Sequence, residues 1–227
     1  MSGLRERQKA DRHRRIIDAA TELFREAGYE GAKIEAIAAQ AEVSIGTIYN
    51  YYQNKGDILG AIVSLEVNEV LNAGRGVVAS PPANVGDALD TLIGIYIEHS
   101  LNYLSKEMWR QAMAISTQLP DSPFGKAYTA LDRDLTEQIS ALIARLQQIG
   151  LVRPDIDGPA VGELIFNNMN MMFIEFVKRD EAKIPELRAA IRRQNRVLVA
   201  SHPNRRHQHP VLPSYRQERA EERALRD

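Results

Sequence analysis

Residues 43–52 read VSIGTIYNYY, and this stretch decides the fold. Ser44 is a favourable N-cap, because its hydroxyl can accept a hydrogen bond from a backbone N–H of the first helical turn. A helix that begins there turns by about 100° per residue, so Ile48 and Tyr52 share an inward face. The opposite face carries small and polar residues, namely Gly46, Thr47, Asn50 and Tyr51. The stretch therefore predicts a short helix with one apolar face and one polar face.

Another short helical pattern precedes it, with apolar residues at Ile34, Ile37, Ala38 and Ala41. Helices this short bury too little surface to be stable alone and need a third helix beside them. Residues 11–27 supply an amphipathic helix for this purpose, and Gly28 is placed to end it. Together the three segments predict a helix-turn-helix domain, whose second helix enters the major groove of DNA by its N-terminal residues.

The outward face of the helix that follows Ser44 suits DNA. Gly46 lets the backbone approach the groove closely, and Asn50 can hydrogen-bond a base edge, most naturally that of adenine. Thr47 can meet a phosphate or a thymine methyl group. Further groups for phosphates come from Tyr49, Tyr51 and Lys55. The alternative is a cluster of core tyrosines beside a solvated lysine.

The first 17 residues form a basic arm in a chain whose formal net charge is −1. Six Lys and Arg side chains stand there against Glu6 and Asp11. Such an arm suits phosphate, although a solvated terminus has the same composition.

These residues carry a resemblance to a known family. The segment from Gly28-Tyr29-Glu30-Gly31 through Ile37-Ala38 to residues 43–52 and Lys55 resembles the DNA-binding domain of the TetR family of bacterial repressors. The resemblance implies a dimer whose larger C-terminal domain binds a ligand. It also implies a DNA-binding set in which Ser44 caps the helix, Ile45 lies close to the bases, Gly46 and Asn50 face them, and Thr47, Tyr49, Tyr51 and Lys55 contact phosphates.

Three residues depart from the family pattern. Lys33 stands where a threonine usually caps the second helix, and a lysine cannot accept the N–H bonds of that cap. We interpret Lys33 as an ammonium directed at phosphate and count it with the DNA-binding residues. Glu42 replaces the usual turn glycine, which predicts a strained turn or a different backbone geometry. Ile45 replaces a frequently polar base reader, so we expect this protein to read an operator sequence of its own.

The rest of the chain is helical in pattern and shows no convincing strand. Further helices are expected at about 57–78, with Asp57 as its cap, and then at 84–104, 106–118, 123–149, 158–179 and 185–200. The sequence thus predicts an all-α fold of about nine helices. We expect three parts: a basic arm and helix-turn-helix domain at 1–56, a helical effector-binding and dimerisation domain at 57–202, and a disordered tail at 203–227.

The second part offers aromatic, methionine and amide side chains of the kind that line pockets for small apolar ligands. Tyr96, His99 and Tyr103 are expected to follow one another along one helix face. The other candidates are Met108, Trp109, Met113, Phe166, Asn167, Asn170 and Phe173. The alternative is ordinary core and dimer interface, and His99 by itself is as consistent with helix packing or the surface.

Dimerisation is expected because a helix-turn-helix domain of this size needs two half-sites for useful affinity. The long helices at 123–149 and 158–179 are joined by a short turn, and two copies of the pair can form a four-helix bundle. The expected interface residues are Leu131, Leu135, Leu142, Leu146, Val161, Leu164, Ile165 and Met172. Periodicity does not decide whether residues 167–172 serve the pocket or the interface.

Composition excludes several classes of function. The sequence has no cysteine, which excludes disulfides and thiolate metal sites, and no stretch long and apolar enough to span a membrane. His99 is the only histidine in residues 57–200, so neither a paired-histidine metal site nor a catalytic triad is expected. We therefore expect no cofactor, no metal and no enzymatic activity, although a helical enzyme or an interaction module without DNA binding remain the alternatives.

The leading hypothesis is a cytoplasmic homodimeric repressor that binds a palindromic operator in double-stranded DNA. A small-molecule effector in the C-terminal part would favour a conformation whose recognition helices no longer match adjacent major grooves. The helix at 57–78 is the expected lever, because it leaves the DNA-binding domain directly.

Overall fold

The computed structural model of the protein describes residues 2–200; the tail predicted at 203–227 lies outside the described residues. Every regular element in the described part is a helix, which confirms the all-α prediction. No helix there is long and apolar enough to cross a membrane. The helices are α1 (Ser2–Gly31), α2 (Ile34–Gln40), α3 (Ile45–Tyr49), α4 (Lys55–Ala79), α5 (Val85–His99), α6 (Lys106–Gln118), α7 (Pro123–Gln148), α8 (Gly158–Val177) and α9 (Ile184–Ala200).

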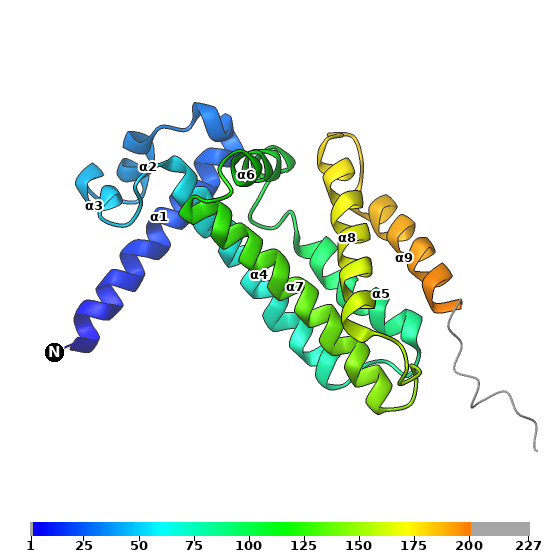
Figure 1. Cartoon of the computed structure of the whole chain (residues 1–227). Coiled ribbons are helices and arrows are strands. Elements are labelled where there is room, and N and C mark those ends of the chain that lie inside the picture. Colours follow the sequence, from blue (N-terminus) through cyan, green and yellow to red (C-terminus); the bar gives the residue numbers. More distant parts are fainter. Residues whose placement is uncertain (1, 201–227) are drawn as a thin grey trace, which may run out of the picture.

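Helices α1 to α3 lie at one end of the molecule, and α4 runs from them into a larger helical body (Figure 1). The core of the small end brings together apolar residues that are almost fully buried, namely Ile16, Phe24, Ile37 and Ile48. Helix α1 is longer than expected at both ends. Gly28 has φ +75°, which breaks the regular helix as its position predicts, but a further turn follows as far as Gly31.

The larger body is built around α4 and α7, which lie side by side (Figure 1). The side chain of Gln138 on α7 joins three of its helices. Its Nε2 donates to the carbonyl of Leu71 on α4 at 2.8 Å, and its Oε1 accepts from the hydroxyl of Tyr96 on α5 at 2.6 Å. These bonds satisfy the polar atoms of a partly buried amide, so α4, α5 and α7 pack without an unpaired group at this point.

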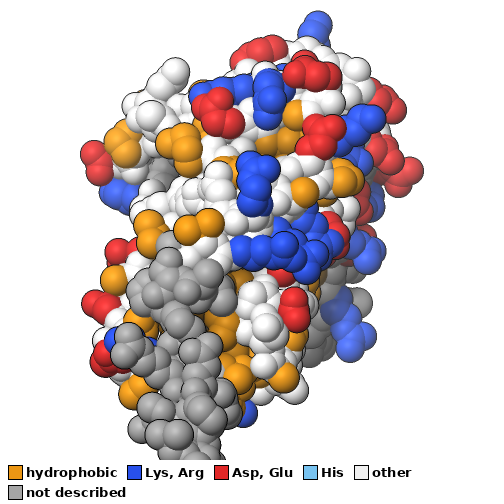
Figure 2. Space-filling model, turned by 90° about the vertical axis from the view of Figure 1, so that its right-hand side faces the viewer, with side chains coloured by type: hydrophobic (Ala, Val, Ile, Leu, Met, Phe, Trp, Pro, Cys, Tyr) orange, Lys and Arg blue, Asp and Glu red, His pale blue; other side chains and the backbone are white. Residues whose placement is uncertain are grey.

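Helix α9 buries Leu187 and Ile191 in the core and is also joined to α5 by charged side chains. Arg188 pairs with Glu98 and with Asp90, and Arg192 lies 3.7 Å from the same Asp90 carboxylate. The face of the molecule that includes α8 and α9 accordingly carries basic and acidic side chains interspersed with hydrophobic ones (Figure 2).

Two local expectations were wrong. Asn54, not Asp57, caps α4: its Oδ1 accepts from the backbone N–H of Asp57 at 3.0 Å, while the Asp57 carboxylate accepts from the N–H of Gln53 at 2.9 Å. This reciprocal pair satisfies two backbone donors, which one aspartate alone would not do. Helix α5 ends at His99 rather than near 104, because the Ser100 carbonyl accepts a hydrogen bond of 2.6 Å from the indole of Trp109 instead of continuing the helix.

The predicted dimer residues are also placed differently. Helices α7 and α8 form a hairpin and pack against each other, and several of the expected interface residues lie inside this packing. Their exposure is 9% or less, which leaves no surface for a partner: Leu135, Leu142, Leu146 and Ile165. Periodicity identified them as buried, but they are buried in the core of their own chain.

Candidate DNA-binding surface and ligand pocket

The turn between α2 and α3 positions the predicted recognition helix. Ser44 caps α3 as expected: its Oγ accepts from the backbone N–H of Thr47 at 3.0 Å and lies 2.8 Å from the Thr47 hydroxyl. Ile48 is fully buried and Tyr52 is 7% exposed, so the inward face is the one that the pattern predicts. The cap and the two inward residues together fix how α3 presents its other face.

That outward face is open to solvent. Ile45 is 41% exposed and Tyr49 is 55% exposed. Gly46 and Asn50 are exposed beside them. Tyr51 is half-buried, and its hydroxyl donates to the backbone carbonyl of Lys9 at 3.2 Å. Tyr51 therefore contacts the basic arm, a role that spacing alone does not indicate.

The two lysines of the predicted set lie in different surroundings. Lys33 is exposed and precedes α2 without any side-chain capping bond, as its chemistry requires. The ammonium of Lys55 instead donates to the carbonyls of Glu30 at 3.1 Å and Ala32 at 3.3 Å, and lies 4.5 Å from the centre of the Tyr29 ring. Lys55 thus ties the end of α1 to the start of α4, whether or not it also meets phosphate.

Glu42 lies in the α2–α3 turn with φ +54°, the left-handed region that glycine adopts freely. Its carboxylate is 3.7 Å from the guanidinium of Arg15 and is 85% exposed, so the ion pair contributes little stability. Arg15 also donates to the Ala41 carbonyl at 2.8 Å, which connects α1 to the turn. The strain anticipated from the missing glycine is present in the backbone.

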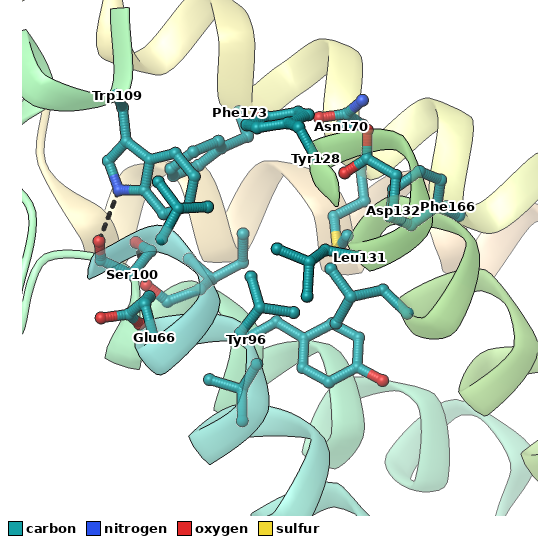
Figure 3. Close-up of a pocket in the computed structure, with 16 residues that line it drawn as sticks. Glu66, Tyr96, Ser100, Trp109, Tyr128, Leu131, Asp132, Phe166, Asn170 and Phe173 are labelled. Atoms are coloured by element: carbon teal, nitrogen blue, oxygen red, sulfur yellow. Dashed lines mark hydrogen bonds between the residues drawn. The ribbon is translucent and has the colours of Figure 1, made fainter. Parts of the chain in front are cut away.

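A pocket lies within the larger body, between α4, α5, α6, α7 and α8 (Figure 3). Its cavity volume is about 70 Å³, and the pocket is partly open to solvent. Its walls are largely aliphatic and aromatic. Five of the ten predicted ligand-binding residues line it: Tyr96, Trp109, Phe166, Asn170 and Phe173.

The other five candidates are absent from the lining. Met108 is fully buried in the core, Met113 is half-buried, and Asn167 is exposed. His99 and Tyr103 do not follow one another on a helix face, because α5 ends between them. The sequence pattern did not identify the lining residues of α4 and α7, among them Val63, Glu66, Val67, Tyr128, Leu131 and Asp132. The apolar ones have the spacing of core residues, and the two acids follow no pattern that distinguishes them from surface acids.

Most polar groups that line the pocket already have partners. The carboxylate of Glu66, which is 2% exposed, lies 2.6 Å from Nδ1 of His99 and accepts from the backbone N–H of Tyr103 at 3.3 Å. Burial raises the pKa of Glu66, and the bond from His99 opposes that shift. The Glu69 carboxylate accepts a hydrogen bond from the Tyr103 hydroxyl at 2.8 Å, and its other oxygen lies 3.2 Å from Nε2 of His99. These contacts fix the α5–α6 loop onto α4.

Three polar side chains of the lining are different. Those of Tyr128, Asp132 and Asn170 form no hydrogen bond or ion pair with any residue in the described part of the chain. Burial raises the pKa of the Asp132 carboxyl from its usual 3.8 to about 6. The pocket therefore has one end whose polar groups are unpaired, and this end includes a carboxyl group in largely apolar surroundings.

Comparison with known proteins identifies the small helical end. Residues 16–62 match the family profile described as bacterial regulatory proteins, tetR family. The match runs from Ile16 in α1 to Ile62 in α4 and so contains the helix-turn-helix. This end of the chain is similar to the DNA-binding domain of the TetR family.

Relatives and solved structures extend the likeness beyond the helix-turn-helix. The fatty acid metabolism regulator protein of Bacillus subtilis (strain 168) is 26% identical over 180 residues, which are 77% of this chain and 88% of that relative. A putative TetR-family regulator from Mesorhizobium loti matches with a TM-score of 0.67 at 19% identity, over 86% of this chain and 98% of that one. Thermus thermophilus FadR, solved with lauroyl-CoA, matches with a TM-score of 0.61 at 21% identity, over 89% and 99%. The relative and both solved structures are described as regulators, and the likeness to the two structures extends the shared fold over most of the chain.

The α5–α6 loop also contacts the end of the molecule that holds the helix-turn-helix. The guanidinium of Arg25 on α1 donates to the carbonyls of Leu101 at 2.7 Å and Asn102 at 2.5 Å. The Glu107 carboxylate, at the start of α6, accepts from the backbone N–H of Tyr29 at 3.3 Å. Since Glu66, Ser100 and Trp109 line the pocket, the pocket wall and α1 share one loop.

Replacing Glu42 by glycine is expected to stabilise the protein. The left-handed backbone at this position costs a side-chain-bearing residue more than it costs glycine, so Glu42→Gly should raise the free energy of unfolding by about 0.5–1 kcal/mol. Denaturant unfolding at fixed protein concentration measures the change. Glu42→Ala keeps the Cβ and loses the ion pair with Arg15, so it should not stabilise the protein. Equal changes in unfolding free energy in the two variants would contradict backbone strain at this position.

Asp132→Asn is expected to stabilise the protein in a pH-dependent way. The folded pKa of about 6 lies above the usual 3.8, so the folded state binds more protons between these values and loses stability as the pH rises through them. The amide carries no charge, so the variant should gain about 1–2 kcal/mol over the parent above pH 6 and little at pH 4. Thermal unfolding across this range tests it, with Glu137→Gln on the exposed side of α7 as control. A gain in stability that is independent of pH would contradict the raised pKa of Asp132.

Proposed function

We propose that this regulator is a homodimeric repressor that binds a palindromic operator and leaves it when a small apolar molecule fills the pocket. The observation that supports this most is the course of α4. Ile58 and Leu59, in its first two turns, are fully buried near the DNA-binding helices, while Val63, Val67 and Val70 farther along line the pocket. One rigid helix therefore takes part in both sites.

The DNA contacts are assigned to the exposed face of α3. Gly46 and Asn50 face bases, Ile45 supplies an apolar contact such as one with a thymine methyl group, and Tyr49 and Thr47 bind phosphates. Lys33 supports the phosphate set, since its ammonium is exposed and has no capping role. Lys55 contributes indirectly: its ammonium donates hydrogen bonds to the carbonyls of Glu30 and Ala32, and these bonds fix the helix-turn-helix domain against α4.

The dimer contact is assigned to the exposed side of α8. Leu164 is 52% exposed and Met171 is 58% exposed. A spacing of seven residues, about two helical turns, places them on the same face of α8. Asn167 is exposed between them, which favours the interface over the pocket for this residue. Two copies of the α7–α8 hairpin can then form a four-helix bundle around a twofold axis, with Leu131, Val161 and Met172 half-buried behind it. A half-site spacing of about 34 Å follows from the pitch of the DNA duplex.

Effector binding is transmitted by α4 and by the α5–α6 loop. A molecule in the pocket contacts Glu66, Ser100 and Trp109, which fix the loop, and the loop is bonded to Arg25 of α1. A displacement of this loop changes the orientation of α1 relative to α4. The effector and the operator then prefer different conformations, and the coupling between them is reciprocal. We place this activity in the cytoplasm, where bacterial operator DNA is found.

Removing phosphate contacts should weaken operator binding in a salt-dependent way. Lys33→Gln removes one charge per protomer, so the slope of log affinity against log salt should fall by about 0.9 for each lost contact, or about 2 for the dimer. Tyr49→Phe should weaken binding with no such change in slope. Mobility shift with operator fragments selected from random DNA measures both, and an unchanged slope in Lys33→Gln removes its proposed role.

The α8 face is tested by introducing a charge. Leu164→Glu should convert the dimer to a monomer, because two carboxylates would face each other across the axis. Operator affinity should then fall at least a hundredfold, as the second half-site is lost. Leu119→Glu is the control, since Leu119 is 57% exposed at the end of α6, away from this face. Sedimentation velocity that finds Leu164→Glu still dimeric would exclude the interface.

Arg25→Ala should separate ligand binding from DNA release. The variant retains both sites but loses the two bonds between α1 and the loop, so an effector should lower operator affinity several-fold less than in the parent. Operator affinity with and without an apolar compound that quenches Trp109 fluorescence measures this ratio. Glu26→Ala, an exposed neighbour on α1, should leave the ratio unchanged. If the effector lowers the operator affinity of Arg25→Ala as much as that of the parent, the signal passes through α4 and not through the loop.

A further inference from the structure

We propose that the pocket recognises an apolar molecule with a protonated amine head group, which binds between Asp132, Asn170 and Tyr128. This inference rests on the proposed function and specifies the chemical class of its effector. It follows from which polar groups of the pocket are already paired and which are not.

The paired and unpaired groups lie at different ends of the pocket. Trp109, Ser100 and Glu66 lie together at one end in the view of Figure 3, while Asp132, Asn170 and Phe166 lie at the other. At the first end the Trp109 indole donates to the Ser100 carbonyl, and Glu66 is bonded to His99. A ligand gains little by competing with these bonds, so its apolar part suits this end.

The second end offers unused hydrogen-bonding capacity. Within residues 2–200 no group donates to the Asp132 carboxylate, and the Tyr128 hydroxyl and Asn170 amide have no partner either. An ammonium has three donors and no acceptor. The carboxylate, the amide oxygen and the phenol oxygen are three acceptors of the kind that it needs.

Charge favours a cation over an anion at this end. None of the sixteen lining residues is Lys or Arg, whereas two of them, Glu66 and Asp132, are acids. An unpaired carboxylate in apolar surroundings is costly, as the raised pKa of Asp132 indicates, and an ammonium beside it removes that cost. A carboxylate or phosphate head group would meet a like charge and no compensating base.

The walls suit the rest of such a molecule. Phe166 and Tyr128 lie among the residues that line the polar end, and the faces of aromatic rings attract cations. Aliphatic side chains form much of the remaining lining, among them Leu131, Val67 and Ile97. An alkyl or aryl chain attached to the amine would therefore extend to the indole, so that its arrival changes Trp109 fluorescence.

A matched series of compounds tests the head group. Decylamine, decanol and decanoate share one chain and differ in charge, and lauroyl-CoA adds the kind of ligand found in Thermus thermophilus FadR. Titration of the full-length dimer follows the fluorescence of Trp109, the only tryptophan of the chain. Decylamine should bind about tenfold or more tightly than decanol and decanoate, the ratio that a charge-assisted hydrogen bond supports.

Variants locate the contact. Asp132→Asn keeps the shape of the side chain and should weaken decylamine about tenfold while leaving decanol unchanged. Glu137→Gln, which removes an exposed carboxylate from the same helix, should leave all four affinities unchanged. Tighter binding of decanoate or lauroyl-CoA than of decylamine overturns the proposal, and so does an undiminished decylamine affinity in Asp132→Asn.

Operator binding separates this inference from the proposed function. If decanol or lauroyl-CoA releases the operator better than decylamine does, effector-controlled repression is supported and the amine head group is wrong. If decylamine binds at Asp132 but no compound of the series changes operator affinity, the amine site is supported and its regulatory role is wrong.

Discussion

A buried carboxylate on α4 is the constraint on which the arrangement of the larger body depends. Glu66 is 2% exposed, and an acid at such a position is stable only where hydrogen bonds compensate for its lost hydration. His99 and the backbone N–H of Tyr103 supply them, and these bonds hold the loop that follows α5 against α4. One polar requirement in the core therefore determines the position of a surface loop.

The α5–α6 loop connects the pocket to the helix-turn-helix end of the molecule. It contacts the pocket through Ser100, whose carbonyl accepts from Trp109. It contacts α1 through the carbonyls of Leu101 and Asn102, which accept hydrogen bonds from Arg25. Hydrogen bonds of this kind are directional, so a change at one end of the loop is costly to absorb without a change at the other. Helix α4 provides a second, stiffer connection through side chains that belong to both ends.

The departures from the family pattern at the DNA-binding end fit the geometry around them. Glu42 occupies a left-handed position that a glycine would take without strain, and its turn is stabilised by Arg15 from α1. Lys33 leaves the start of α2 uncapped, which exposes its ammonium. Ile45 places an apolar side chain in solvent on the face of α3 that the motif directs at DNA. Each residue gives up some stability of the isolated domain at a position near its exposed face.

The helical class, the helix-turn-helix, the Ser44 cap and the inward pair Ile48 and Tyr52 could be predicted from the sequence, because they follow from local spacing and local hydrogen bonds. What each buried face contacts could be learned only from the folded chain. Leu142 and Leu146 lie in the core of their own chain, whereas Leu164 remains on the surface, although all three share the same apolar periodicity. Periodicity reports that a face avoids water but not which partner covers it, and the unpaired end of the pocket around Asp132 arises only where α7 and α8 meet.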